Sequence, residues 1–212
     1  MKNRTVYMYV FDTMADWEWG YVTAELKTGR FFKKDIPPFT VKTFSLTKET
    51  IVTIGGVRII PDNYVEEIVP EDCALLLLPG GETWLDPMHA PVIEIVKDFL
   101  LAGIPVAAIC GATIALAAAG ILDQYLHTSN DISYLKAVCP QYKGEQNYQS
   151  DSAVTDRNLI TAGGVAPLEL AYHVLKRLAV CSNETLDSWY KLNKLQDSQY
   201  FYKLMQSLQG GL

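Results

Sequence analysis

One cysteine stands at a position where a thiol can do chemistry. The stretch VAAICGATIALAAAG (residues 106–120) runs from small and β-branched apolar residues, through Cys110, into an alanine-rich helical pattern. This pattern predicts a buried strand that leads directly into a helix, with Cys110 at the turn. The free N–H groups at the start of that helix favour a thiolate over a thiol. A thiolate is a nucleophile and an oxidation target, so Cys110 is our first candidate; the alternative is a small buried hydrophobe.

The other cysteines are explained by packing. Cys73 lies inside an apolar strand pattern, Cys139 precedes a proline, and Cys181 follows a helical pattern. The four cysteines form no CxxC pair and have no metal-ligand spacing, so we expect no metal site. The first residues lack a cleavage site for export, so we expect reduced thiols and a cytoplasmic protein.

A carboxyl group follows the first strand pattern. Glu18 lies in ADWEWG, between Trp17 and Trp19. Beside indoles and close to a thiolate, its pKa would be raised, and it could hold a proton and act as acid and base. The alternative is a solvated glutamate at the start of a helix. Asp16 is assigned that second role, in which it complements the helix dipole.

A glycine pair follows a buried strand. LLLLPGG (residues 75–81) ends at Gly81, and glycines at such a point let backbone N–H groups face an oxyanion or a carboxylate. A Pro-Gly-Gly sequence is also an ordinary turn, so this motif alone is a weak signal.

Strand and helix patterns alternate along the chain, which predicts a mainly parallel sheet with helices on both faces. Strand patterns cover residues 5–11, 39–46, 51–54, 57–60, 73–78, 105–109, 153–155 and 159–161. Helical patterns cover residues 15–27, 90–102, 111–119, 131–138 and 167–178, with two more after residue 183. We expect Gly29 to end the first helix and Asn130 to cap the helix over 131–138. Without a linker or repeat, residues 1–212 are expected to form a single α/β domain, with its ligand site at the carboxyl ends of the strands.

The composition limits the partners. The chain has 212 residues, 49% of them hydrophobic and 20% charged, with a formal net charge of −6 and a pI of about 5.1. An acidic chain without a basic patch predicts no nucleic-acid partner and no anionic membrane surface. No apolar run has the length of a membrane span. A mean hydropathy of +0.07 indicates apolar surface buried between subunits.

Five motifs in this order, ADWE, LLLLPGG, AAICGA, LHTSN and TAGGVAPLELA, resemble the ThiJ/PfpI superfamily, which includes a parkinsonism-associated deglycase. The resemblance implies a class I glutamine amidotransferase-like fold, a flavodoxin-like three-layer sandwich. It implies that Cys110 is the reactive cysteine and Glu18 its hydrogen-bond partner. Gly81 and Gly111 match the N–H donors of an oxyanion pocket, and His127 in LHTSN matches a histidine near the cysteine.

The chain has three histidines, and His127 is the best candidate partner for the cysteine. A purely structural role for His127 stays open. His89 in DPMHAP has a loop-like context and is expected to be exposed. His173 follows Glu169 by one helical turn, which favours a local side-chain pair.

Two departures weaken particular activities. Intracellular peptidases of the superfamily carry a histidine directly after the cysteine, where this chain has Gly111. Amidotransferase domains need a downstream His-Glu dyad, and no histidine precedes Glu169 in TAGGVAPLELA.

The resemblance therefore implies a small-molecule enzyme without metal or organic cofactor. In it the Cys110 thiolate adds to a reactive carbonyl, in a glyoxalase-, deglycase- or hydrolase-like reaction. The alternative is a redox-responsive stress protein that senses oxidants through Cys110 without turnover. A peptidase or amidotransferase-like hydrolase is a weaker alternative. Relatives are commonly dimers, so we expect a homodimer.

Three aromatic or loop features complete the expectations. Some of Trp17, Trp19 and Trp84 are expected to wall the pocket. The aromatic tail, residues 181–212, is expected to pack on the sheet or on a second subunit. The segment RFFKKDIPPF (residues 30–39) fits either the rim of the site or a subunit contact.

Overall fold

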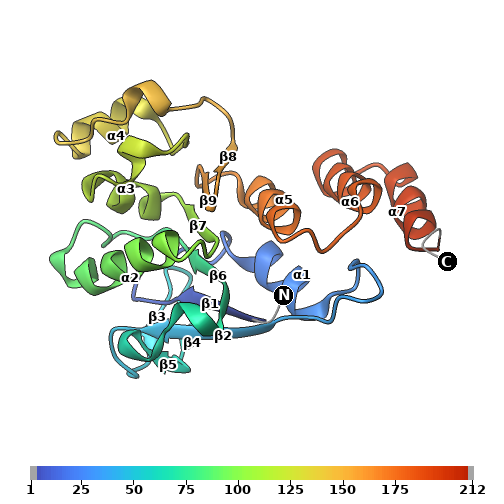
Figure 1. Ribbon diagram of the computed structural model, residues 1–212, viewed down its shortest axis with the longest axis horizontal. Coiled ribbons are helices and arrows are strands. Elements are labelled where there is room, and N and C mark those ends of the chain that lie inside the picture. Colours follow the sequence, from blue (N-terminus) through green and yellow to red (C-terminus); the bar gives the residue numbers. More distant parts are fainter. Residues whose placement is uncertain (1–3, 210–212) are drawn as a thin grey trace.

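A seven-stranded sheet forms the centre of the protein (Figure 1). The structure, a computed structural model, describes residues 4–209. The sheet has the order β5-β2-β1-β6-β7-β9-β8, and all its pairs are parallel except β8 with β9. Its strands are β1 (Thr5–Tyr9), β2 (Thr40–Ser45), β5 (Asn63–Tyr64), β6 (Cys73–Leu78), β7 (Val106–Ile109), β8 (Ala153–Asp156) and β9 (Leu159–Ala162). The predicted mainly parallel α/β sheet is confirmed.

Helices lie on both sides of this sheet. They are α1 (Gly20–Thr28), α2 (Ala90–Leu101), α3 (Gly111–Ala118), α4 (Ile132–Val138), α5 (Pro167–Arg177), α6 (Asn183–Leu195) and α7 (Gln199–Gln209). In Figure 1, α2 and α3 (green) lie on one side of the strands, and α1 (blue) and α5 (orange) lie on the other. Across residues 4–209, no helix is both long enough and apolar enough to cross a membrane.

The core follows the apolar runs of the sequence. Every side chain of β6 and β7 is buried, as expected for central parallel strands with helices on both faces. One contiguous cluster of buried apolar side chains extends from Val6 in β1 to Leu204 in α7. Each fully buried leucine of β6 contributes roughly 1.5–3 kcal/mol relative to an exposed one. The single-domain organisation stays a prediction.

The order of the strands creates a crevice at their carboxyl ends. Strand β1 lies between β2, the next strand in the sequence, and β6, which follows later in the chain. The loops after β1 and β6 therefore leave in opposite directions, and ligands of open α/β sheets bind at such a point. The loops after β7 and β9 follow along the same edge.

The start of the first helix differs from the prediction. The helix α1 begins at Gly20, so residues 15–19 form a loop. The carboxylate of Asp16 accepts hydrogen bonds from Thr53 Oγ1 (2.6 Å) and the Gly55 N–H (2.7 Å). It therefore holds the hairpin of β3 (Ile51–Val52) and β4 (Arg58–Ile59) instead of complementing a helix dipole, and that assignment was wrong. Gly29 ends α1 as predicted.

The tail packs on helices. The two helices predicted after residue 183 are confirmed as α6 and α7, and α6 packs against α5 and α7. The indole N–H of buried Trp189 donates to Glu25 Oε1 in α1 (3.1 Å). The tail thus packs on the domain, as one of the two expected arrangements, and it does so through α5 and α1, which cover that face of the sheet. Packing on a second subunit stays a prediction.

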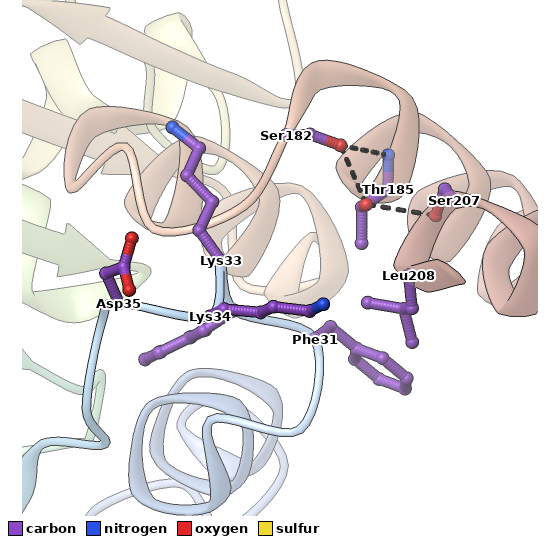
Figure 2. Close-up of a pocket in the computed structure, with 9 residues that line it drawn as sticks. Phe31, Lys33, Lys34, Asp35, Ser182, Thr185, Ser207 and Leu208 are labelled. Carbon is purple, nitrogen blue, oxygen red and sulfur yellow. Dashed lines mark hydrogen bonds between the residues drawn. The ribbon is translucent and has the colours of Figure 1, made fainter. Parts of the chain in front are cut away.

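The segment 30–39 lies beside these terminal helices. Its residues 31–35 line a cavity of about 310 Å³ together with side chains of α6 and α7. Figure 2 shows Ser182, Thr185 and Ser207 linked by hydrogen bonds in this cavity. The Ser207 hydroxyl donates onward to Leu204 O (2.7 Å), so the hydroxyl protons are used within the protein. This segment does not line the cavity beside Cys110.

Candidate active site

Cys110 occupies a strained turn between β7 and α3, as predicted. Its backbone has φ 57° and ψ −122°, a region that residues with a side chain rarely adopt. Its N–H donates to Ala162 O at the end of the neighbouring strand β9 (3.0 Å), and its carbonyl accepts from the Thr113 N–H (3.0 Å). Such a conformation costs roughly 1–3 kcal/mol and persists only where the surroundings impose it. The strain therefore presents the thiol at the edge of the sheet.

Glu18 lies beside this thiol and is fully buried. Its Oε2 accepts a hydrogen bond from the Gly80 N–H (2.5 Å), while Oε1 has no partner of full hydrogen-bond geometry. The Cys110 thiol is the neighbouring group that interacts with this carboxyl. The loops after β1, β6 and β7 thus bring an acid, an amide and a thiol together.

Two glycines make this approach possible. A Cβ atom at Gly80 would lie 2.6 Å from Cys110 Cβ and 2.7 Å from Glu18 Oε2. A Cβ atom at Gly164 would lie 2.8 Å from Cys110 Sγ and 3.2 Å from Glu18 Oε1. A single methyl group at either position would touch both functional side chains. The sequence analysis included Gly80 in its glycine pair but assigned the donor role to Gly81, and it did not single out Gly164.

The thiol and the carboxyl form a coupled acid pair. Burial raises the pKa of Glu18, while hydrogen bonds with the Gly80 N–H and the Cys110 thiol lower it. Burial also raises the pKa of Cys110; the Asn130 amide lowers it, Glu18 raises it, and the Gly111 N–H lowers it. The overall direction for the pKa of Cys110 is upward, which runs against the expectation of a resting thiolate at the helix N-terminus. Burial and the neighbouring acid outweigh the helix N–H groups.

Asn130 contacts the thiol, which sequence reasoning missed. Its Nδ2 donates to Cys110 Sγ (3.3 Å), and its Oδ1 accepts from the Gly164 N–H (2.7 Å). The predicted capping role was wrong, because Asp131 caps α4 by accepting from the Tyr134 N–H (2.7 Å). Asn130 and Asp131 are both good capping residues, and one helix start needs only one of them. Two good capping residues before a single helix were therefore the sign in the sequence that one of them has another role.

A cavity of about 430 Å³ opens at the thiol. It is lined by Trp17, Glu18, Cys110, Asn130, Gly163, Gly164 and Val165. Of the three tryptophans considered, only Trp17 lines it. Trp84 is buried and donates to Pro79 O (2.8 Å), and Trp19 packs against the hydrophobic core. The expectation that some of these tryptophans wall the pocket is therefore met by Trp17.

Gly81 and Gly111 lie next to each other but do not line this cavity. A Cβ atom at Gly111 would lie 2.7 Å from Gly81 O and 3.3 Å from Gly81 N. The Gly111 N–H acts on the Cys110 sulfur. A role of these two N–H groups in holding an oxyanion stays a prediction.

His127 lies outside the cavity and bonds elsewhere. Its Nδ1 is 2.7 Å from Tyr125 O and its Nε2 is 2.6 Å from the Tyr142 hydroxyl. A carbonyl only accepts, so Nδ1 carries the hydrogen and Nε2 accepts from Tyr142. Both ring nitrogens are thus occupied, which favours the structural role that the sequence left open.

The other two histidines differ from expectation. His89 is buried, not exposed, because it packs among Tyr9, Phe11 and Trp84 and bonds to the Tyr9 hydroxyl (2.8 Å). His173 bonds to Thr155 Oγ1 (2.8 Å) and does not pair with Glu169. The Glu169 carboxylate instead accepts from Lys194 and Tyr190 in α6.

The other three thiols are buried, and burial raises the pKa of each, to about 12 for Cys73 and Cys181. In the part of the chain that the structure describes, no three Cys, His, Asp or Glu side chains converge as metal ligands would. The thiol, carboxyl and amide side chains that line the cavity are Cys110, Glu18 and Asn130.

Known proteins resemble nearly the whole chain. The model of the DJ-1/PfpI family matches residues 4–177. The "uncharacterized protease YoaZ" of Bacillus subtilis (strain 168) is 50% identical over 208 residues, covering 98% of this chain and 99% of that protein. "Uncharacterized protease YdeA" of the same organism is 32% identical over 185 residues, covering 87% and 88%.

Solved structures agree with this match. A thiJ/pfpI family protein from Bacillus anthracis superposes with a TM-score of 0.94 at 51% identity, covering 98% of each chain. The DJ-1 superfamily protein Atu0886 from Agrobacterium tumefaciens gives a TM-score of 0.78 at 27% identity, covering 91% of this chain and 98% of that one. The fold and the resemblance read from the five motifs are thereby confirmed, and the chain belongs to the DJ-1/PfpI family.

Proposed function

We propose that the protein is a Cys110-dependent enzyme that acts on small reactive carbonyl compounds, with α-oxoaldehydes such as methylglyoxal as substrates. One observation carries the proposal. A cysteine on a strained turn opens into a cavity and lies beside a buried carboxyl that has one oxygen without a full hydrogen bond. A thiol and a base in this arrangement form an activated nucleophile.

In the first step Cys110 adds to the aldehyde. As the sulfur–carbon bond forms, the thiol proton passes to the Glu18 carboxylate, and the carbonyl π pair becomes an alkoxide. The Asn130 amide lies at the sulfur, and the N–H groups of Gly81 and Gly111 are the proposed donors to the developing charge. Glu18 returns the proton to the alkoxide, which gives a hemithioacetal.

In the second step Glu18 moves a carbon-bound proton. The hydrogen on the sulfur-bearing carbon is acidic because it lies next to the ketone. Glu18 removes it, and the electron pair moves onto the ketone oxygen, which takes up the proton of the neighbouring hydroxyl group. The electron pair left on that hydroxyl oxygen then forms the thioester carbonyl, while Glu18 returns its proton to the former ketone carbon. The product is a thioester, and water cleaves it to a 2-hydroxy acid and the free thiol. The sequence consumes one water and needs no external oxidant or reductant.

Replacement of the sulfur tests this function. Cys110→Ser should lower kcat/KM for conversion of methylglyoxal to lactate by about 10³-fold or more, since removal of a nucleophile abolishes the covalent route. Cys181→Ala is the matched control, because this cysteine is buried away from the cavity. Lactate is measured by NMR. Unchanged lactate formation by Cys110→Ser would refute the proposal.

A redox-responsive role is the second candidate function, and the burial of the other thiols favours it. Cys110 is partly exposed, whereas Cys73, Cys139 and Cys181 are buried. Two molecules of hydrogen peroxide would oxidise the Cys110 thiol in turn to a sulfenic acid and then to a sulfinate, and each peroxide would be reduced to water. Mass spectrometry should find two added oxygens on Cys110 before any on the other three. Preferential oxidation together with absent turnover would favour the sensor over the enzyme.

Peptidase activity is a weaker alternative. The two Bacillus subtilis relatives carry the word protease in their names. In this chain Gly111 follows the cysteine, and His127 bonds to Tyr125 and Tyr142. A Cys110-dependent release of peptides from casein would revive this alternative.

The homodimer and the cytoplasmic location belong to the same proposal. Sedimentation velocity tests the dimer, with a sedimenting species of twice the chain mass of 23.7 kDa as the expected result.

A further inference from the structure

The peptide group of Gly164 is held from both sides above the thiol. Its carbonyl accepts from the Trp17 indole N–H (3.1 Å), and its N–H donates to Asn130 Oδ1 (2.7 Å). This Gly164 clamp joins the loop after β1, the loop after β9 and the start of α4. It uses the polar atom of the indole, so the ring of Trp17 presents only apolar surface to the cavity.

Apolar side chains frame the cavity where it opens. Trp17 is 56% exposed and Val165 is 98% exposed, yet both line the cavity that holds Cys110. A large apolar side chain left in water beside a concave site is typical of ligand contact. An indole fixed by a hydrogen bond offers such a contact at low entropic cost.

The lining of this cavity carries no positive charge to bind an anionic substrate. Apart from Cys110, its only titratable lining residue is Glu18, and no lysine, arginine or histidine is among the lining residues in the described part of the chain. The Gly164 N–H is already bonded to Asn130, whose Nδ2 donates to the sulfur. A carboxylate or phosphate on the substrate would lose its hydration without a counter-charge and would face the Glu18 carboxyl.

We propose that this site selects uncharged electrophiles that carry a flat apolar substituent, and that Trp17 sets this preference by packing against the substituent. For the enzyme proposed above, on which this substrate class rests, the preferred compounds are uncharged aryl α-oxoaldehydes. Phosphorylated or carboxylated carbonyl compounds and charged peptides are disfavoured.

Turnover of three substrates tests the preference. Phenylglyoxal, methylglyoxal and glyoxylate differ in apolar area and charge. Trp17→Ala should lower kcat/KM for phenylglyoxal by about 10-fold, the value of one aromatic contact, and leave methylglyoxal within about twofold. Trp17→Phe keeps the aromatic face but loses the N–H to Gly164, and should retain the preference. Glyoxylate should be the poorest substrate for all three proteins.

Alkylation of Cys110 gives a readout that needs no turnover. For Cys110 of the wild type, the ratio of the iodoacetamide rate to the iodoacetate rate should be about 10-fold larger than the same ratio for 2-mercaptoethanol, because iodoacetate is negatively charged. In the wild type, N-phenylmaleimide should alkylate Cys110 faster than N-ethylmaleimide does. This rate difference should disappear in Trp17→Ala and persist in Trp17→Phe.

The outcomes separate the two proposals. Cys110-dependent turnover with a phenylglyoxal preference unchanged in Trp17→Ala would overturn this inference and leave the enzyme standing. Absent turnover with the expected alkylation pattern would overturn the enzyme and support the selectivity. Two results would overturn the selectivity itself. One is an iodoacetamide-to-iodoacetate rate ratio equal to that of 2-mercaptoethanol, and the other is a preference for N-phenylmaleimide that is the same in the wild type and in Trp17→Ala.

Discussion

Gly80→Ala is the substitution that most directly tests the geometry of the thiol and the acid. The added Cβ would lie 2.6 Å from Cys110 Cβ and between 2.7 and 3.0 Å from the two Glu18 oxygens. Carbon atoms in contact are ordinarily about 3.5–4.0 Å apart, so this contact must open by about 1 Å. Cys110 Cβ belongs to a constrained turn and Glu18 is fully buried, so neither can move without disturbing its neighbours.

The size of the effect follows from this displacement. Overpacking of a well-packed interior by one methyl group costs roughly 1–3 kcal/mol of unfolding free energy. For a chain of this length that corresponds to a fall in Tm of about 2–12 °C. A shift of about 1 Å between a nucleophile and its base lowers kcat/KM by about 10²-fold. Loss of reactivity should therefore exceed what the loss of stability explains.

The assay compares Gly80→Ala with Gly20→Ala. A Cβ at Gly20, the first residue of α1, meets no atom within 4 Å, so this control should keep its Tm or gain slightly. Thermal unfolding by circular dichroism and the rate of Cys110 alkylation by iodoacetamide are measured on both. If Gly80→Ala matches Gly20→Ala in both, Glu18 and Cys110 do not face each other across Gly80, and our account of the site is refuted.

Two further substitutions test the charges and the histidine. Burial raises the pKa of Glu18 above its ordinary 4.5, so the folded state holds this proton more tightly than the unfolded chain does, and wild-type stability falls as the pH rises through that range. As the pH is raised above 4.5, the Tm of Glu18→Gln should therefore increase relative to the Tm of the wild type. A Tm difference that shrinks as the pH rises would contradict the assigned burial. Tyr142→Phe removes the hydroxyl 2.6 Å from His127 Nε2 and should cost about 0.5–1.5 kcal/mol in denaturant unfolding while kcat/KM stays within about twofold. A large fall in kcat/KM with intact stability would instead give His127 a part in the reaction.

The turn at Cys110 was predictable because its causes are local. Small residues before it build a buried strand, and an alanine-rich stretch after it builds a helix, so only a sharp turn can connect them. Cys73–Leu78 was predicted with its observed bounds for the same reason, since a continuous apolar run suits a strand buried on both faces.

The groups around the thiol were not predictable, because tertiary contacts choose them. Asn130 is 20 residues from Cys110, and nothing local distinguishes it from the capping residue Asp131. Gly81 was expected at the site, but the loop after β6 places Gly80 against Glu18 instead. Trp17 and Trp19 are two positions apart, and the late start of α1 sends only Trp17 to the cavity.

The Gly164 clamp also has a consequence for biosynthesis. The hydrogen bond between Trp17 and Gly164 joins residues 147 positions apart. On the ribosome, Cys110 emerges long before Gly164, so a growing chain carries an ordinary, unselective cysteine. The proposed selectivity can therefore arise only after β9, the last strand in the sequence, has joined the sheet and placed Gly164 beside Trp17.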